Sequence, residues 1–355
     1  MSLRIGILGT RGIPNHYGGF EQCAQYLSVG LVSRGHLVTV YNSSLHPFQE
    51  SNWHGVNIQV CRDREDSMGT AGQFIYDLNC IWHARSMQFD VIIQLGYTSS
   101  SIWHFLWPKT KHIVNMDGLE YKRDKYSSTV KSFLKWAEKV ATKRADLLIA
   151  DNPGIESYLR SKYKNPVRHI SYGADIPTQF NVDHLSEFGL KPEAYDLTIA
   201  RMEPENSIET IIQAYAKLER KLVLVGSTQT PFGRKLKETY SHVVFLEQLF
   251  DKEKLDALRY YSSKYIHGHT VGGTNPSLLE AMACNCAVIA HDNVFNRAVL
   301  KNAGQYFNDV QNLWSILKDE KAHGSTSAVD IIRQAHSWDD IVIQYEQACY
   351  AVVEG

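Results

Sequence analysis

Residues 267–283 read HGHTVGGTNPSLLEAMA, a glycine turn followed by the start of a helix. Asn275 is a strong N-cap residue and Pro276 suits the first helical position, so the pattern predicts a helix that begins at Pro276. The unpaired N–H groups and the positive dipole end of that helix would meet the turn at 272–274, where glycine lets a phosphate approach the backbone. We therefore expect an anion site, although an ordinary capped loop shows the same local pattern.

One acidic residue adds a second function to this stretch. Glu280 lies about one turn into the predicted helix, and carboxylate oxygens accept hydrogen bonds from sugar hydroxyls. The pattern therefore favours a ligand that carries both a phosphate and a sugar.

Length and composition set the class of protein. At 355 residues the chain is long for a single core, so two domains are expected. With 44% hydrophobic and 21% charged residues it is typical of a globular protein. No apolar run approaches the roughly 20 residues that cross a bilayer and no secretory signal opens the chain, so we expect a cytoplasmic protein. Its cysteines lack metal-site spacing and are expected to be reduced and buried: Cys23, Cys61, Cys80, Cys284, Cys286 and Cys349.

Short apolar runs alternate with amphipathic segments along the whole chain. This pattern predicts two doubly wound, Rossmann-like parallel-sheet domains, whose strand ends bind ligands at their carboxyl edges. The expected parts are an N-terminal domain over 1–175, a polar linker over 176–195, a C-terminal domain over 196–336, and a terminal helix over 337–355 that packs back towards the N-terminal domain.

Charge is divided unevenly between the halves. Residues 1–175 hold 20 Lys and Arg against 15 Asp and Glu, whereas residues 176–355 hold 17 against 23. Part of the positive excess recurs every fourth residue on one predicted helix, whose other face is formed by Phe133, Trp136, Ala137, Val140 and Ala141. This stripe is either the solvated side of a core helix or a contact with an anionic membrane surface or lipid acceptor. Its members are Lys131, Lys135, Lys139 and Lys143. A nucleic-acid partner is not expected at a pI near 6.9.

Several segments, taken in order, carry a resemblance to a known family. They are GTRGIPNHYGGFE at 9–21, NMDGLEYKR at 115–123, ADLLIADNPGI at 145–155, HISYGAD at 169–175, ARMEPENSIETII at 200–212 and the stretch at 267–285. In this order the chain resembles the retaining glycosyltransferases of family 4, which have the two-domain GT-B fold. It looks most similar to a branch of proposed bacterial rhamnosyltransferases.

The resemblance implies transfer of a sugar, with rhamnose the expected one, from a nucleotide diphosphate to a saccharide or lipid-linked acceptor in surface polysaccharide assembly. Charge then develops on the leaving diphosphate, where cations and helix N-termini stabilise the transition state. Glu280 matches the residue that holds the nucleotide ribose. The donor diphosphate residues implied by the match are Gly18, Gly19, Arg201, Asn206, Gly273, Thr274 and Asn275.

Two positions depart from the family pattern. The signature places a glutamate eight residues before Glu280, but this chain has Gly272 there. A phosphate-binding lysine is usual where this chain has Asn206. The departures indicate either a donor with different hydroxyl groups, such as a deoxysugar, or a weakened enzyme.

Further polar residues are expected to take part in catalysis. Asp117 and Glu120 follow a predicted strand and would position the acceptor or assist its deprotonation, unless they pair with Lys122 or Arg123 at the surface. His269, with His267 and His16, would contact the donor phosphate or sugar, although such histidines are as often structural. No ligand spacing indicates a metal, so neither metal nor cofactor is expected.

Two alternative functions stay open at this stage. The chain would be a nucleotide-sugar binding protein with weakened catalysis, or a nucleotide-sugar epimerase of the same architecture. A dehydrogenase is disfavoured, because the glycines after the first strand do not follow the dinucleotide-binding pattern.

Overall fold

The chain folds into two compact α/β units. The computed structural model describes residues 1–123, 126–318 and 326–355. The first unit comprises Met1–Tyr121, Tyr126–Tyr172 and Trp338–Gly355, and the second comprises Lys122–Lys125 and Gly173–Ser337.

The first unit is built on a sheet whose strands are mostly buried. Its strands are β1 (Arg4–Leu8), β2 (Leu37–Ser43), β3 (Asn52–Trp53), β4 (Val56–Cys61), β5 (Val91–Leu95), β6 (Lys111–Asn115), β7 (Leu147–Ala150) and β8 (Val167–His169). The helices are α1 (Gly19–Ser33), α2 (Glu65–Met68), α3 (Thr70–Ala84), α4 (Ser128–Arg144), α5 (Pro153–Lys162) and α13 (Trp338–Glu354), with 3₁₀ turns η1 (Ser100–Leu106) and η2 (Glu120–Lys122).

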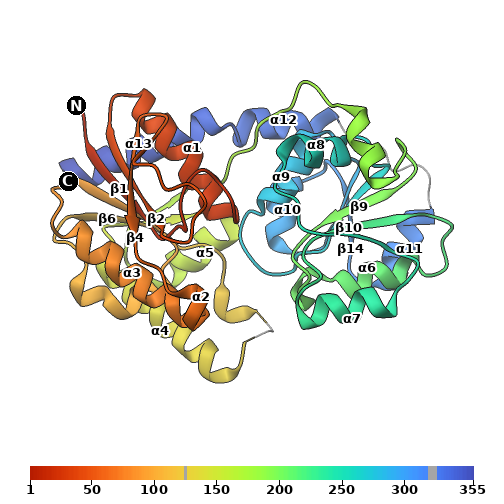
Figure 1. The fold of residues 1–355 in the computed structure, drawn as a ribbon, viewed down its shortest axis with the longest axis horizontal. Helices are drawn as coiled ribbons and strands as arrows, with labels where there is room; N and C mark the ends of the chain where they lie inside the picture. Colours follow the sequence, from red (N-terminus) through yellow and green to blue (C-terminus); the bar gives the residue numbers. More distant parts are fainter. Residues whose placement is uncertain (124–125, 319–325) are drawn as a thin grey trace. The chain divides into compact units, whose positions relative to one another are not determined.

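The strands of this sheet run in the order β3-β4-β2-β1-β5-β6-β7-β8. All neighbours are parallel except β3, which pairs antiparallel with β4 at the edge. Helices α1 and α13 cover one face, and α3 and α4 lie on the other (Figure 1). Strands buried between helices read as continuous apolar runs, which is why the sequence indicates a parallel sheet here.

The second unit repeats the architecture. Its strands are β9 (Asp196–Ile199), β10 (Leu222–Val225), β11 (Val244–Leu246), β12 (Lys264–His267), β13 (Val288–His291) and β14 (Gln305–Phe307). Its helices are α6 (Ile208–Tyr215), α7 (Pro231–Thr239), α8 (Lys252–Tyr260), α9 (Pro276–Ala283), α10 (Val294–Leu300), α11 (Val310–Lys318) and α12 (Thr326–Ala335), with 3₁₀ turns η3 (Val182–Phe188) and η4 (Pro204–Asn206).

The second sheet has the order β11-β10-β9-β12-β13-β14, and every neighbouring pair is parallel. Ile211, Leu224, Ile266 and Phe307 belong to its core and are almost fully buried. The expected fold class, two doubly wound parallel-sheet domains, is therefore confirmed, with β3 as the one antiparallel strand in the parts described.

The strand order reverses once in each sheet. In the first unit β1 and β5 are neighbours although three strands separate them in sequence, and in the second unit β9 and β12 are neighbours across β10 and β11. The crevice outside the carboxyl ends at such a switch point is where doubly wound sheets bind ligands.

The polar stretch at 176–195 is not featureless. It includes η3, and Phe180 stacks on Tyr260 with ring centroids 3.9 Å apart. The terminal helix α13 belongs to the first unit, where Asn115 of β6 donates a hydrogen bond to Tyr345 over 3.1 Å. Contacts between residues more than 200 positions apart thus tie the C-terminus into the first unit.

All six cysteines are buried and unbridged, which agrees with the expected buried thiols. Burial raises the pKa of Cys23 and Cys286 to about 12, which disfavours the thiolate and its reactivity. No helix among the described residues has the length and apolar character needed to cross a bilayer.

Candidate functional site

The stretch at 267–283 folds as predicted. Helix α9 begins at Pro276, and the Asn275 side chain accepts a hydrogen bond from the Ser277 backbone N–H over 2.9 Å. Gly272 has φ +137°, a conformation that side-chain-bearing residues rarely adopt, yet a Cβ built there meets no atom within 4 Å. A side chain at this position would therefore be strained by the backbone conformation and not by crowding.

Arg201 lies two residues beyond β9, at the switch point of the second sheet. Its side chain is 64% exposed and forms an ion pair with Glu203 over 3.8 Å. An extended guanidinium at the carboxyl edge of a parallel sheet is suited to bind phosphate oxygens.

Asn206 has a different role from the family's lysine. Its side chain is buried and donates a hydrogen bond to the Arg201 carbonyl over 2.8 Å. The amide therefore closes the turn that carries Arg201, and the expectation that Asn206 itself contacts phosphate gains no support from this geometry.

The loop after β12 lies directly against this turn. A Cβ at Gly268 would come within 2.2 Å of the Asn206 carbonyl oxygen, so only glycine fits. Thr270 donates two hydrogen bonds to the Glu205 carbonyl, from its backbone N–H over 3.0 Å and its hydroxyl over 2.8 Å. These contacts bring Arg201 and the 272–275 turn to the same edge of the second sheet.

Two histidines stack beside this loop. The rings of His267 and His269 are 4.4 Å apart between centroids and 15° from parallel. Burial, with a smaller contribution from His291, lowers the pKa of His267 to about 3. The pKa of His269 is held well below its usual value, mainly by burial and then by His267 and the nearby cations Arg201 and Arg123. Both imidazoles are therefore neutral near pH 7, and each can donate one hydrogen bond and accept another.

Two asparagine side chains hold the backbone of His269 in place. Asn293 and Asn296 each donate a side-chain hydrogen bond to the His269 carbonyl over 3.0 Å. Among the described residues, His269 Nδ1 and both ring nitrogens of His267 have no hydrogen-bond partner in the protein. Buried polar atoms of this kind are usually satisfied by water or by a ligand.

A second cation near His269 is one that the sequence did not indicate. Arg123 groups with the second unit and pairs with the buried Glu205 carboxylate over 3.5 Å. The motif NMDGLEYKR placed Arg123 only as a possible partner of Asp117 or Glu120, because separation along the chain conceals its proximity to Glu205.

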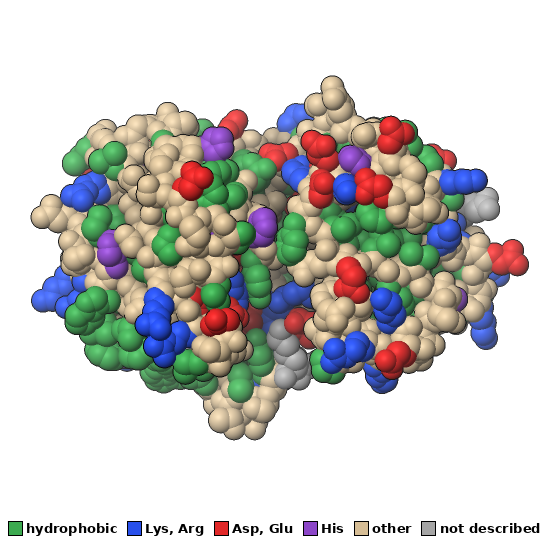
Figure 2. All heavy atoms as spheres, in the orientation of Figure 1, with side chains coloured by type: hydrophobic (Ala, Val, Ile, Leu, Met, Phe, Trp, Pro, Cys, Tyr) green, Lys and Arg blue, Asp and Glu red, His purple; other side chains and the backbone are tan. Residues whose placement is uncertain are grey.

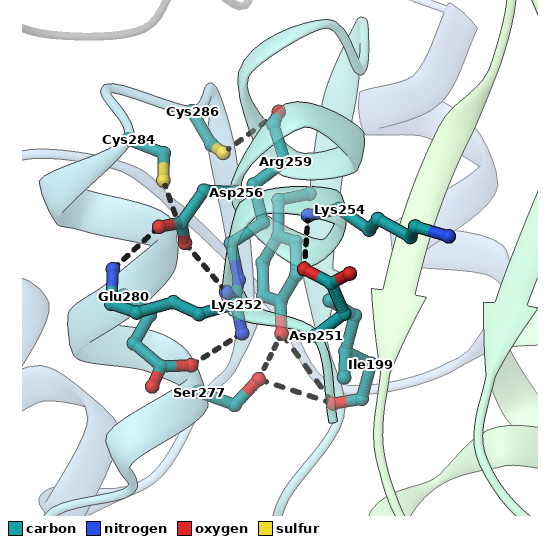
Figure 3. A network of polar contacts seen from close by, with 11 residues as sticks. Ile199, Asp251, Lys252, Lys254, Asp256, Arg259, Ser277, Glu280, Cys284 and Cys286 are labelled. Carbon is teal, nitrogen blue, oxygen red and sulfur yellow. Dashed lines mark hydrogen bonds and ion pairs between the residues drawn. The ribbon is translucent and has the colours of Figure 1, made fainter. Parts of the chain in front are cut away.

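Glu280 is held by a buried arginine (Figure 3). Arg259 of α8 donates a hydrogen bond to the Glu280 carboxylate and another to Asp256 over 3.1 Å. The side chain of Arg259 is 3% exposed and that of Glu280 is 21% exposed. Burial lowers the pKa of Arg259, but Glu280 and Asp256 more than compensate and raise it above its ordinary value.

The sequence did not single out Arg259. The sequence of its helix is charged and amphipathic, which is typical of a solvent-exposed helix. In the structure Arg259 is buried, together with Asp256 and Cys284 of the same network. The apolar neighbours Ala257 and Leu258 are the one local signal that this side of α8 faces the core.

Helix α1 of the first unit begins at Gly19, and Gly18 is its N-cap residue. Gly18 has φ −171°, which any residue adopts, and its nearest neighbour for an added Cβ is Glu21 at 3.6 Å, an ordinary contact. Neither strain nor crowding within the protein requires glycine at 18. The expected contact of Gly18 with a diphosphate stays a prediction.

Asp117 and Glu120 follow β6 at the carboxyl edge of the first sheet, and both are half-buried. Asp117 has φ +51°, and its backbone N–H donates to the Asn115 side chain over 3.0 Å. Asp and Asn tolerate this conformation better than other side chains. The carboxylate of Asp117 is also one of the charges that raise the pKa of the buried Tyr97 and Tyr172.

No group of three or more His, Cys, Asp or Glu side chains in the described ranges is arranged to hold a metal ion. The expectation of a metal-independent protein stays a prediction.

Two family profiles match the chain. One described as "Domain of unknown function (DUF1972)" matches residues 3–175, and one described as "Glycosyl transferases group 1" matches residues 187–314. A search of the curated proteins found no match to this sequence.

Solved structures with the same fold cover nearly the entire chain. A sucrose-phosphate synthase from Thermosynechococcus elongatus superposes with a TM-score of 0.82 at 18% identity, covering 99% of both chains. The Anabaena protein HepE in complex with UDP and glucose gives 0.74 at 17% identity, covering 98% of this chain and 99% of that one. The catalytic domain of Arabidopsis thaliana starch synthase IV, bound to ADP and acarbose, gives 0.72 at 14% identity over 100% of both.

Proposed function

Since the chain is a glycosyltransferase with the GT-B fold, we propose that it transfers a sugar, with rhamnose the favoured one, from a nucleotide-diphosphate sugar with retention at the anomeric carbon. The acceptor is a saccharide or a lipid-linked saccharide in surface polysaccharide assembly. The family 4 resemblance of the motifs supports this assignment, and the geometry at one edge of the second sheet carries it.

That geometry joins a cation, a helix N-terminus and a carboxylate. Arg201 and the turn at 272–275 lie at the carboxyl edge where β9 and β12 meet, and Glu280 is one turn into α9. In our proposal Arg201 and the N–H groups of Gly273, Thr274 and Asn275 bind the diphosphate, while Glu280 binds the ribose. Negative charge grows on the leaving diphosphate during transfer, so these donors lower the barrier.

The donor sugar is assigned to the surroundings of His269. Its neutral imidazole offers a hydrogen-bond donor and acceptor, and Gly272 supplies no carboxylate where the family's usual sugar contact stands. A deoxysugar, which has one hydroxyl fewer to bind, is consistent with that loss.

The acceptor is assigned to the first unit, where Asp117 and Glu120 follow β6. The leaving phosphate accepts the acceptor proton in transfers on one face of a sugar, so the two carboxylates position the acceptor hydroxyl and assist its deprotonation. Gly18 and Gly19, at the N-terminus of α1, are the residues of the first unit that we propose for phosphate binding.

Binding of nucleotides tests the donor assignment. UDP, GDP and dTDP are added separately to the purified protein and thermal unfolding is followed, because a ligand that binds only the folded state raises the midpoint. We expect one of them to raise it. No shift with any of the three nucleotides would overturn the donor site.

Turnover separates the proposed function from its alternatives. A weakened nucleotide-sugar binding protein would bind the nucleotide without transfer or donor hydrolysis, and an epimerase would interconvert donor sugars without an acceptor. We expect acceptor-dependent transfer, with the donor's anomeric configuration kept in the product by NMR.

We place the reaction in the cytoplasm, at the inner face of the membrane where lipid-linked acceptors are elongated. Lys135, Lys139 and Lys143 are exposed on α4, and Lys131 is half-buried one turn earlier. Basic residues near an anionic surface each contribute about 1 kcal/mol of attraction, screened by salt. The lysine row therefore supports a peripheral contact with anionic lipid.

A further inference from the structure

An apolar strip lies on the outer side of the first unit, beside the lysine row of α4. Two contacts join the elements that carry it: the Trp103 indole of η1 donates to the Phe74 carbonyl of α3 over 2.7 Å, and the ring centroids of Phe74 and Phe133 of α4 are 6.1 Å apart. Figure 2 shows hydrophobic side chains gathered over α3 and α4.

Three large aromatic side chains of this strip reach solvent. Trp82 on α3 is 65% exposed, Phe105 on η1 is 59% exposed and Trp136 on α4 is 42% exposed. Arg85, one turn after Trp82, donates to the Leu106 carbonyl over 2.9 Å, which places the ends of α3 and η1 together. His104, next to Phe105, lies 6.3 Å from Trp136 between ring centroids. The three aromatics thus belong to adjoining elements.

The exposure of Trp136 corrects an expectation. The sequence pattern placed Phe133, Trp136, Ala137, Val140 and Ala141 on the face of α4 opposite the lysines. Ala137, Val140 and Ala141 are buried, together with Leu134, but Trp136 reaches solvent. Successive residues of an α-helix are about 100° apart, so Trp136 lies at the edge of the buried stripe and part of its ring reaches solvent.

The lysine side of α4 is concave. Lys135, Lys139 and Lys143 line an open groove of about 550 Å³ together with Lys162 and Tyr163 of the α5 end. Lys162 is committed to the buried Glu138 carboxylate over 2.7 Å, so the exposed positive charge of the groove comes from α4. The exposed surface of α4 therefore carries both Trp136 and the lysines Lys135, Lys139 and Lys143.

We propose that this face, formed by Trp82, Phe105, Trp136 and the α4 lysines, docks on the surface of an anionic lipid bilayer with the aromatics at headgroup depth. Tryptophan is favoured at membrane interfaces because an apolar ring and a polar N–H are both satisfied there. Lysines beside it neutralise anionic headgroups. Stable peripheral binding generally needs two such contributions together.

The inference deepens the proposed membrane contact by adding insertion to electrostatic attraction, and it predicts a component that salt does not remove. Screening weakens the lysine contribution, whereas burial of aromatic surface is insensitive to moderate ionic strength.

Vesicle co-sedimentation of the full chain tests the proposal. Vesicles contain phosphatidylcholine alone or with phosphatidylglycerol, at low and at moderate salt. We expect binding to the mixed vesicles and little to phosphatidylcholine alone. Replacing the three α4 lysines (Lys135→Gln, Lys139→Gln and Lys143→Gln together) should weaken low-salt binding by roughly 100-fold. Replacing the aromatics (Trp82→Ser, Phe105→Ser and Trp136→Ser together) should abolish the binding that persists at moderate salt.

Matched controls keep the outcome interpretable. Phe250→Ser with Val294→Ser removes two exposed apolar side chains of the second unit and should leave vesicle binding unchanged. Trp82→Ser alone, at the most exposed of the three aromatics, serves if the triple variant unfolds; it should lower salt-resistant binding in part. Brominated lipid should quench tryptophan fluorescence less in Trp82→Ser than in the wild type.

Three results would overturn the proposal. The first is absence of binding to the mixed vesicles, and the second is aromatic variants that bind like the wild type. The third is a dimeric wild type that becomes monomeric in the aromatic variant, which would assign the strip to a second copy of the chain. Nucleotide-induced stabilisation is followed in parallel. If neither the wild type nor any variant is stabilised by a nucleotide, the donor assignment is contradicted and the result on membrane binding is unaffected.

Discussion

Arg259 on α8 and Glu280 on α9 form a buried ion pair in which a guanidinium with almost no solvent contact orients a carboxylate that does reach solvent. Asp256, one turn before Arg259 on α8, holds the other side of the guanidinium (Figure 3). A buried arginine shared by two carboxylates has its position determined from both sides, so Glu280 is oriented before any ligand arrives.

Replacing Arg259 should be costly to the fold. The substitution Arg259→Met removes a buried cation that two carboxylates share. We therefore expect the free energy of unfolding, measured with urea, to fall by about 3–5 kcal/mol. Arg333→Met, which breaks the exposed pair with Asp330, is the control and should change it by at most about 1 kcal/mol. Equal effects in both variants would show that Arg259 is not the centre of a buried network.

Glu280 should discriminate between sugar moieties of the nucleotide. With Glu280→Gln we expect the affinity for the stabilising nucleotide to fall roughly tenfold or more, since a hydrogen bond to a charged group contributes about 1.5–3 kcal/mol. The affinity for the 2′,3′-dideoxy analogue of that nucleotide should fall much less on the same substitution. Calorimetric titration measures both, and equal losses for the two ligands would exclude a ribose contact.

Arg201 should matter for binding and hardly for stability. Its side chain is mostly exposed, so Arg201→Ala is expected to change the free energy of unfolding by less than about 0.5 kcal/mol. Nucleotide affinity should fall, and its dependence on salt should weaken, because one cation facing the diphosphate is lost. Arg234→Ala, at another exposed arginine of the second unit, is the control and should leave both quantities unchanged.

Acid should destabilise the protein through His267. Its folded pKa of about 3 lies below the value of about 6.5 for an unfolded histidine, so only the unfolded state gains a proton between these values. The contribution of His267 to the free energy of unfolding is therefore fully present above pH 6.5. It falls by up to about 1.4 kcal/mol per pH unit as the pH decreases towards 3. His267→Phe should reduce this slope in urea unfolding between pH 7 and 5. An unchanged slope, like that expected for the exposed His242→Phe, would contradict the assignment.

Gly272 should resist substitution because of its backbone and not its surroundings. Gly272→Ala and Gly272→Glu should both destabilise the protein by about 1–3 kcal/mol, and by similar amounts, since φ +137° disfavours any Cβ while the space beside it is open. A neutral Gly272→Ala would show that the turn adopts another conformation. The glutamate variant also tests whether restoring the family's carboxylate changes donor preference.

Local patterns were sufficient for the elements of the site. The N-cap Asn275 and Pro276 determine where α9 begins. The first N–H groups of a helix need hydrogen-bond partners, and residues within one turn supply them, so this signal is local. Apolar runs likewise indicated most of the parallel strands. The short edge strands β3, β8 and β14 were not predicted, since two or three residues are too few for a periodic signal.

The sequence by itself therefore determined the two-domain α/β class and the turn, cap and carboxylate at 267–283. Tertiary structure decided which distant residues join them: Arg259 beside Glu280, Arg123 beside Glu205, and the Asn206 amide bonded to the Arg201 carbonyl. It also decided that Trp136 faces solvent. The physical reason is that helix and turn propensities act over three or four neighbouring residues, whereas burial and ion pairing depend on packing between elements far apart in the chain.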